Sequence, residues 1–166
     1  MNLRITLLGA LMALAPALKA QSLPDEMYFS PDGRMLFSGG QQHQGLYNDS
    51  VVKSIYLTFA QPNYWTLLTQ NYANKIDLPA TMVLDGVTYD SVGVRFKGQT
   101  SYMAVQGQKK SFNISLDYAI AGQDVEGYET FNLNNCFQDE SFLREVFYQH
   151  QIRKHIPAAK SAFVKL

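Results

Sequence analysis

The chain has 166 residues, a formal net charge of zero and a hydrophobic fraction of 46%. This length allows one domain with a substantial core and is short for two domains. The composition is typical of a globular protein rather than a disordered one, and the neutral charge gives no support for electrostatic capture of nucleic acid or of an anionic membrane.

The first twenty residues, MNLRITLLGALMALAPALKA, differ in composition from the rest of the chain. One early cation, Arg4, is followed by an apolar run and then by small residues, which is the pattern of a secretory signal peptide. The apolar run is shorter than the roughly 20 residues that a membrane-spanning helix needs, so no membrane span is predicted. We therefore expect residues 1–20 to be a cleaved signal peptide and the protein to be secreted, or held in the periplasm or cell envelope.

Residues 21–45 are rich in Gln, Gly, Ser and Pro and show no sustained periodicity, which favours a linker or a loosely docked arm. Order is expected to begin near Leu46. The β-branched and aromatic run at 51–59 predicts a strand, and the helical spacing of apolar residues at 63–73 predicts a short amphipathic helix. The pair Asp85-Gly86 lies between two further strand patterns and predicts a β-hairpin over 80–96.

The second half of the chain continues with strand patterns at 111–118 and 128–133. Period-two spacing in the first of these predicts a half-buried strand. Asp139 is expected to cap a helix that runs to about His155, with an inward side formed by Phe142, Leu143, Val146, Phe147 and His150. Residues 160–166 are expected to begin a final strand. The fold class is therefore α+β, an antiparallel sheet with two packed helices.

A loop with the ingredients of an anion site connects the strand that ends near 97 to the strand that begins near 111. Glycine lets backbone N–H groups approach an anion, hydroxyl groups add donors, and lysines neutralise phosphate charge. The candidate residues are Gly98, Thr100, Ser101, Lys109 and Lys110. The alternative is an ordinary hairpin loop with a solvated basic edge, because the Walker and Rossmann glycine patterns are both absent.

A second candidate group lies in the stretch from 124 to 149, DVEGYETFNLNNCFQDESFLREVFYQ. Glu145 falls on the flank of the apolar side of the expected helix, where a partly desolvated carboxylate needs a cation such as Lys109 or Lys110. A strand lysine paired with a helix glutamate is how kinases hold nucleotide phosphates. The alternative is an exposed glutamate, with the nearby asparagines bonding turns. The single cysteine, Cys136, is expected to be a buried thiol rather than a nucleophile.

Several of these segments together resemble the spore-coat CotH family of secreted, atypical protein kinases. The segments are VGVRFKGQTSY, KKSFNISLDY, GYETFNLNNCFQDESFLREVFYQ and IPAAKSAFVKL, with weaker likeness upstream in VVKSIYLTFAQPNYWTLL and PATMVLDGVTYDSVGVRFKG. The likeness extends over 46–166, which we take as one CotH-like domain resembling the N-terminal lobe of a reduced kinase-like fold.

The resemblance implies transfer of phosphate from ATP, with a divalent metal such as Mg or Mn, to Ser or Thr of secreted or surface proteins. By analogy with the family, Gly98, Thr100 and Ser101 would lie over the phosphates, Lys109 or Lys110 would hold them, and Glu145 would position that lysine. The sequence leaves the choice between the two lysines open.

The family's metal-binding carboxylates are expected in a second half that follows the last strand of this chain. The chain therefore resembles a truncated N-terminal lobe, expected to be inactive alone. The competing hypothesis is an exported, non-enzymatic β-rich module. It would bind glycans or surface proteins through Tyr64, Trp65, Tyr72 and Tyr102, or would act as a structural part of an envelope or coat.

Overall fold

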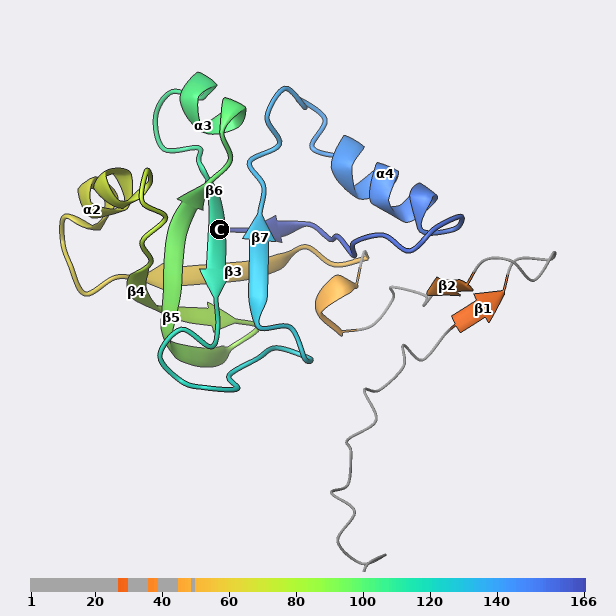
Figure 1. The fold of residues 1–166 in the computed structure, drawn as a ribbon, viewed down its shortest axis with the longest axis horizontal. Coiled ribbons are helices and arrows are strands. Elements are labelled where there is room, and N and C mark those ends of the chain that lie inside the picture. The colour runs from red at the N-terminus through yellow and green to blue at the C-terminus, as the bar shows by residue number, and fades with distance from the viewer. Residues whose placement is uncertain (1–26, 30–35, 39–44, 49) are drawn as a thin grey trace, which may run out of the picture.

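A computed structural model describes residues 27–29, 36–38, 45–48 and 50–166 (Figure 1). The expected signal peptide, 1–20, lies outside the described residues. Within the expected arm, strand β1 (Met27–Phe29) pairs antiparallel with β2 (Leu36–Ser38). The elements that follow are η2 (Gly45–Tyr47), β3 (Lys53–Thr58), α2 (Tyr64–Asn71), β4 (Leu78–Leu84), β5 (Val87–Lys97), α3 (Thr100–Ala104), β6 (Ser111–Ser115), β7 (Thr130–Leu133), α4 (Arg144–Ile152) and β8 (Val164–Lys165). The α+β class predicted from the sequence is confirmed.

One six-stranded sheet organises the chain after residue 45, in the order β7-β6-β5-β4-β3-β8. Neighbouring strands from β3 to β7 pair antiparallel, as predicted. Strand β8 differs, because it pairs parallel to β3, with Lys53 opposite Val164. The sheet is therefore mixed rather than purely antiparallel. The long connection through α4 carries the chain from one edge of the sheet to the other, and a parallel neighbour requires a crossover of this kind (Figure 1).

The hairpin between β4 and β5 forms where the sequence predicts it. Asp85 and Gly86 have φ values of 51° and 80°, and two consecutive residues with positive φ match the right-handed twist of the flanking strands. The Lys53 ammonium on the neighbouring strand β3 forms an ion pair with the Asp85 carboxylate. The hairpin places the long strand β5 in the middle of the sheet, with Lys97 at its end.

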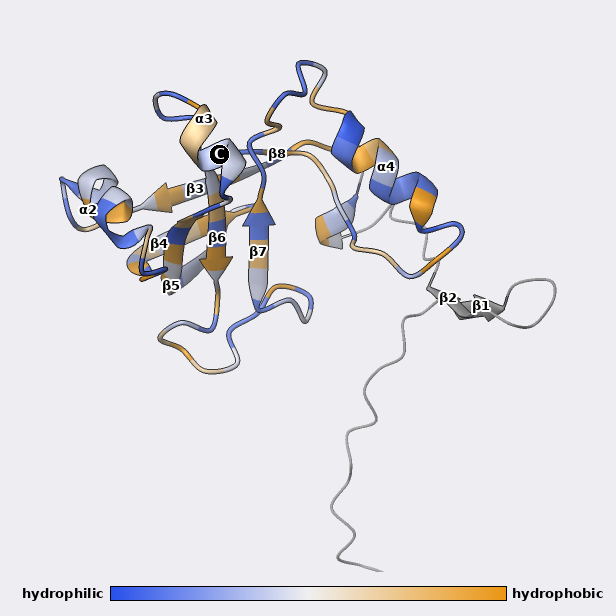
Figure 2. Cartoon of the chain, turned by 45° about the horizontal axis from the view of Figure 1, so that its top comes forward, coloured by the Kyte–Doolittle hydropathy of each residue, from blue (hydrophilic) through white to orange (hydrophobic). Residues whose placement is uncertain are grey.

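The hydrophobic core lies on one face of the sheet and is covered by α2, which packs against β4 and β5. Leu68 of this helix is 0% exposed, and the Trp65 ring lies 4.8 Å from the Phe96 ring, centroid to centroid. Figure 2 shows how hydrophobic residues concentrate on the central strands. The most deeply buried side chains are Ile55, Leu68, Met82, Val92, Val94, Ile114 and Leu116.

Strand β6 is buried more completely than its pattern predicts. Phe112 and Ile114 are buried as expected, but Ser111 and Asn113, on the opposite face, are also buried, at 4% and 7% exposure. On that face the segment after β7 contacts Ser111, because the Asn135 N–H donates to the Ser111 hydroxyl oxygen at 3.1 Å. The Asn113 side-chain amide donates to the Asn132 side-chain oxygen at 3.1 Å. The second face of the sheet at β6 is therefore polar, and its residues Ser111 and Asn113 are nevertheless buried.

The helix expected to start after Asp139 begins instead at Arg144 and ends at Ile152, and none of its residues is buried. Phe142, Leu143 and Phe147, expected on its inward side, are 50%, 56% and 65% exposed. Val146 and His150 are half-buried, so α4 approaches the rest of the chain through a less apolar side than predicted. Helix α3, a short helix within the expected glycine loop, was not predicted from the sequence.

Candidate functional site

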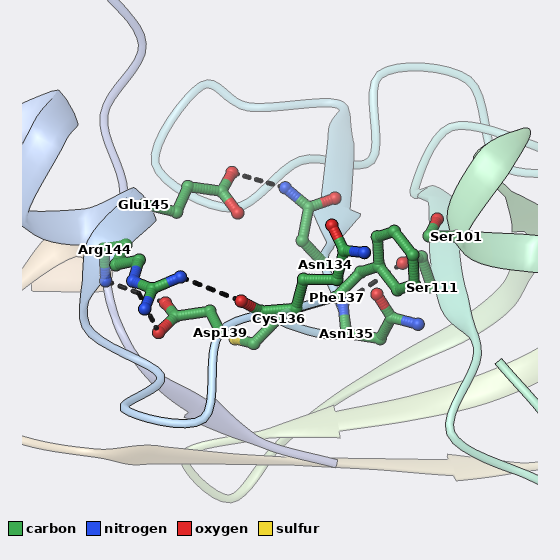
Figure 3. Close-up of a pocket in the computed structure, with 10 residues that line it drawn as sticks. Ser101, Ser111, Asn134, Asn135, Cys136, Phe137, Asp139, Arg144 and Glu145 are labelled. Carbon is green, nitrogen blue, oxygen red and sulfur yellow. Dashed lines mark hydrogen bonds and ion pairs between the residues drawn. The ribbon is translucent and has the colours of Figure 1, made fainter. Parts of the chain in front are cut away.

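A polar pocket of about 430 Å³ lies beside the start of α4 (Figure 3). One wall is formed by Ser101 of α3 and by Ser111, the first residue of β6. The other is the segment 134–144, which connects β7 to α4 and which we call the pocket wall. The lining residues of this segment and of the helix start are Asn134, Asn135, Cys136, Phe137, Gln138, Asp139, Arg144 and Glu145.

The backbone of the pocket wall is unusual. Cys136, Gln138 and Phe142 have φ values of 51°, 55° and 61°, in a backbone region that residues other than glycine rarely adopt. Each such residue costs on the order of 1–3 kcal/mol unless its surroundings hold it in place. Asn135 provides part of that support, because its N–H donates to Ser111 Oγ at 3.1 Å and its side-chain amide donates to the Lys109 carbonyl at 2.9 Å. Strain is thus concentrated around a polar cavity.

Asp139 organises the turn that leads into α4. Its Oδ1 accepts hydrogen bonds from the N–H and hydroxyl of Ser141, and its Oδ2 accepts one from the backbone N–H of Arg144 at 2.8 Å. Asp139 therefore accepts a hydrogen bond from the first residue of α4, five positions later in the chain. It does not cap a helix that begins directly after it, as the sequence predicted. The Ser141 hydroxyl chiefly lowers the pKa of the Asp139 carboxyl from its usual range, and the Arg144 and Ser141 N–H groups and the Arg144 charge also lower it, against a raising effect of burial.

Three side chains link the sheet to α4 across this region. Lys97 Nζ, at the end of β5, donates to Asn134 Oδ1 at 2.9 Å, and Asn134 Nδ2 donates in turn to Glu145 Oε1 at 2.5 Å. Burial lowers the pKa of the Lys97 ammonium, and the Glu145 carboxylate opposes that shift. A strand lysine and the helix glutamate are thus linked through an asparagine, but the lysine is Lys97, whereas the sequence analysis named Lys109 or Lys110.

The two lysines considered from the sequence make other contacts. Lys110 Nζ donates to the backbone carbonyls of Tyr102 and Val105, at 2.8 and 2.5 Å, and so fastens the end of α3. Lys109 Nζ lies over the Phe142 ring, 4.6 Å from its centroid. Among the described residues, no hydrogen bond or ion pair joins either lysine to Glu145. Sequence reasoning placed Lys97 at the end of a strand without a role. The signal that could have found it is the pairing of the strand that ends near 97 with the strand that begins near 111, which puts Lys97 opposite Ser111, a residue that lines the pocket.

The expected glycine loop is a compact structure rather than an open one. Gly98 has a φ of 87°, and a Cβ atom there would lie 2.5 Å from Ser101 Oγ, so the position requires glycine. The Gly98 carbonyl accepts a hydrogen bond from the Tyr72 hydroxyl, whose ring stacks on that of Tyr102. Of the three loop candidates, Ser101 lines the pocket, whereas Gly98 and Thr100 are not among its lining residues.

Comparison with known protein families identifies the segment that carries this site. Residues 94–166 match the model of a family described as CotH kinase protein. These residues are thus similar to the CotH kinase family. The match begins within β5, includes Lys97, the pocket wall and α4, and ends at β8. The CotH resemblance predicted from the sequence is confirmed for this segment, and the upstream likeness at 46–93 lies outside the match. No curated protein matches the chain.

The polar pocket lies within residues 94–166, which we call the CotH segment. Its side chains fit phosphate groups better than they fit a metal ion. The part of the chain that the structure describes contains no group of three or more His, Cys, Asp or Glu residues that could hold a metal. Both carboxylates that line the pocket are engaged within the chain, Asp139 with its turn and Glu145 with Asn134. The hydroxyls of Ser101 and Ser111 line the pocket and are groups that bind oxyanions. Lys97 is such a group as well; it does not itself line the pocket but is hydrogen-bonded to Asn134, which does.

Cys136 also lines the pocket of the CotH segment, and its thiol is free. Burial chiefly raises the pKa of Cys136, the Asp139 and Glu145 carboxylates raise it further, and Lys109 lowers it. The thiol is therefore disfavoured as a thiolate nucleophile, in line with the expectation from the sequence, although Cys136 is half-buried rather than fully buried.

The aromatic residues of the competing hypothesis are largely engaged within the fold. Trp65 packs against Phe96 and Phe112, and Tyr72 stacks on Tyr102. Tyr64 stacks on Phe59. These contacts engage the rings within the fold, although Tyr64 is still 36% exposed. In addition, none of the helices in the described ranges is long and apolar enough to cross a membrane.

Proposed function

We propose that the pocket beside Lys97 binds the phosphates of ATP, and that the chain is the nucleotide-binding part of an exported CotH-type protein kinase. Its substrates would be Ser or Thr residues of secreted or surface proteins. The observation that carries the proposal is the linked arrangement of Lys97, Asn134 and Glu145 at a polar pocket within the segment that matches the CotH family. Export rests on the predicted signal peptide at 1–20.

The chemistry of the pocket supports phosphate binding. Lys97 is half-buried, so its charge acts in surroundings where electrostatic attraction is stronger than in water. Ser101 and Ser111 add hydroxyl groups on the opposite wall. The volume of about 430 Å³ lies in the range of small-molecule sites, roughly 300–1,000 Å³.

Phosphoryl transfer requires more than this pocket supplies. A kinase needs carboxylates to hold Mg²⁺ and to orient the attacking hydroxyl. Asp139 and Glu145 are already hydrogen-bonded within the chain and are poorly suited to either role. We therefore propose that this chain binds nucleotide without transferring phosphate, and that transfer requires acidic residues from a further part of a longer polypeptide.

The test is ATP binding, measured by isothermal titration calorimetry, in the variant Lys97→Met. This change keeps most of the length of the side chain and removes its charge. Because a hydrogen bond to a charged group contributes roughly 1.5–3 kcal/mol, ATP affinity should fall at least about tenfold. Lys109→Met separates the proposal from the expectation based on sequence, and Lys75→Met, in the turn after α2, serves as an exposed control.

Unchanged ATP affinity in Lys97→Met, together with a loss in Lys109→Met, would transfer the role to Lys109. Absence of ATP binding by the unsubstituted chain would reject the nucleotide proposal and favour the non-enzymatic module. The exposed apolar residues of α4 would then be the first surface to examine for a protein partner.

A further inference from the structure

Arg144, the first residue of α4, is the one cation among the described residues that line the polar pocket. Its side chain is 74% exposed, so the guanidinium is open to a ligand from solvent. Figure 3 shows the side chain turned from the start of α4 toward the backbone of the pocket wall. The sequence analysis considered only lysines as partners for phosphate and assigned no role to Arg144.

Two contacts orient the guanidinium without using up its donors. Arg144 Nη1 donates to the Gln138 carbonyl at 2.9 Å, and Nε lies 3.6 Å from Asp139 Oδ1. A guanidinium carries five N–H donors in one plane. Among the described residues, no hydrogen bond or ion pair involves Nη2. Its two donors are left for an oxyanion, which a planar guanidinium can bind through two parallel hydrogen bonds.

We propose that Arg144 is a phosphate-binding residue, whose guanidinium contacts the phosphate oxygens of the nucleotide across the pocket from the hydroxyls of Ser101 and Ser111. This inference rests on the proposed function, which assigns the pocket to the phosphates of ATP. It adds a cation that itself lines the pocket, whereas Lys97 is connected to the pocket through Asn134.

The charges around the pocket require this second cation. Asp139 and Glu145 both line the pocket and are formally negative, so an anion is attracted only where nearby cations offset them. Lys97 supplies one positive charge through Asn134. Without Arg144 this group would carry a net negative charge, and with Arg144 it is formally neutral. The Asp139 carboxylate beside Arg144 orients the cation, as a glutamate orients the phosphate-holding lysine of a kinase.

The turn before α4 does not depend on the Arg144 side chain. Asp139 Oδ2 accepts its hydrogen bond from the Arg144 backbone N–H, and Asp139 Oδ1 accepts from the hydroxyl and N–H of Ser141. All three bonds are preserved when the Arg144 side chain is replaced. A substitution at this exposed position should therefore leave the chain folded, so that a change in anion binding can be assigned to the guanidinium.

The experiment compares Arg144→Met and Arg144→Lys with Lys75→Met, the exposed control in the turn after α2. Binding of ATP and of tripolyphosphate is measured by calorimetry. Arg144→Met removes the charge and the donors and should weaken the binding of both anions by at least about tenfold. Arg144→Lys keeps the charge but loses the planar pair of donors, so it should weaken binding by only about threefold to fivefold. Lys75→Met should bind both anions as the unsubstituted chain does.

An NMR measurement on the unsubstituted chain distinguishes contact with the anion from an effect on the turn. The Nε–H signal of Arg144 should shift when tripolyphosphate is added. The signal of Arg153 is the internal reference, because that residue is 7% exposed and its Nη1 donates to the Ala158 carbonyl. It should not move. A residue that only supports the turn would not give this selective shift.

Three results would overturn the inference. If Arg144→Met binds both anions normally while Lys97→Met loses ATP binding, the role of Arg144 is rejected and the proposed function stands. If Arg144→Met loses affinity but the Nε–H signal of Arg144 does not respond to tripolyphosphate, direct contact is rejected. If the unsubstituted chain binds neither ATP nor tripolyphosphate, both proposals fail together. Thermal unfolding of each variant verifies that it is folded.

Discussion

The sheet and the pocket wall are stabilised by different forces. In β5 and β6, Val92, Val94 and Ile114 are 0% exposed, and the regular antiparallel ladders satisfy the backbone. In the pocket wall, from 134 to 144, three residues have positive φ and the backbone depends on side chains such as Asp139 and Ser111 for its partners. The sheet is held by burial of apolar area, and the wall by individual hydrogen bonds worth about 1 kcal/mol each.

This contrast explains why the candidate site lies where it does. A strained, polar segment is less stable than the sheet, but it can present side chains to a ligand in geometries that regular strands do not provide. The sheet supplies the rigid support, because Lys97 is the last residue of the central strand β5. The candidate function thus depends on a less stable segment, the pocket wall, that lies beside the more stable sheet.

The largest loss of stability should come from a substitution in the core of the sheet. Ile114→Ala removes a side chain that is 0% exposed and leaves a cavity, so the free energy of unfolding should fall by about 2–5 kcal/mol, as measured by urea denaturation. Ile114→Val is the control and should cost about 0.5–1.5 kcal/mol. A loss in Ile114→Ala no larger than that of Ile114→Val would contradict the view that burial at β6 holds the fold.

Asp139→Asn should lower the free energy of unfolding by a smaller amount, and this loss should depend on pH. The folded-state pKa of Asp139 lies below its usual value, so the ionised carboxylate stabilises the fold above the unfolded-state pKa of about 3.9. This contribution disappears as the pH falls through the lower, folded-state pKa. Unfolding curves at neutral pH should therefore show a deficit for Asp139→Asn, and the deficit should shrink in acid.

The reference for that measurement is Asp90→Asn, because the Asp90 carboxylate contacts the Thr81 hydroxyl at 3.4 Å but lies away from the pocket wall. A deficit in Asp139→Asn that stays constant from neutral pH to acid would show that the turn depends on the shape of the residue and not on its charge.

The smallest effect is expected on the outer side of α4. Phe147 is 65% exposed, so Phe147→Ser should change the free energy of unfolding by only about 0.5 kcal/mol. The same change at Phe96, which is 2% exposed, should cost at least about 3 kcal/mol. Chemical denaturation compares the two. If Phe147→Ser proved as costly as Phe96→Ser, α4 would be packed in solution, and the contrast between the two regions would be smaller than the structure indicates.

Much of the fold could be predicted from local patterns. The strand at 51–59, the helix near Trp65 and the Asp85-Gly86 hairpin each follow from the spacing of a few adjacent residues, and the structure contains all three. The candidate site was predicted less completely. Glu145 and Ser101 line the pocket, but Lys97 and Asn134 were not assigned their roles, and α4 is shorter and more exposed on its apolar side than its pattern predicts.

The sequence by itself determined the α+β class, the succession of strands along the chain from β3 to β7 and the CotH resemblance over 94–166, because period-two alternation, turn residues and motif strings are all local features. Only the tertiary structure decided that β8 runs parallel to β3, that Lys110 fastens α3, and that Lys97 meets Glu145 through Asn134. These outcomes depend on contacts between residues far apart in the chain. Several lysines have the same local chemistry, and only their position relative to the sheet distinguishes them.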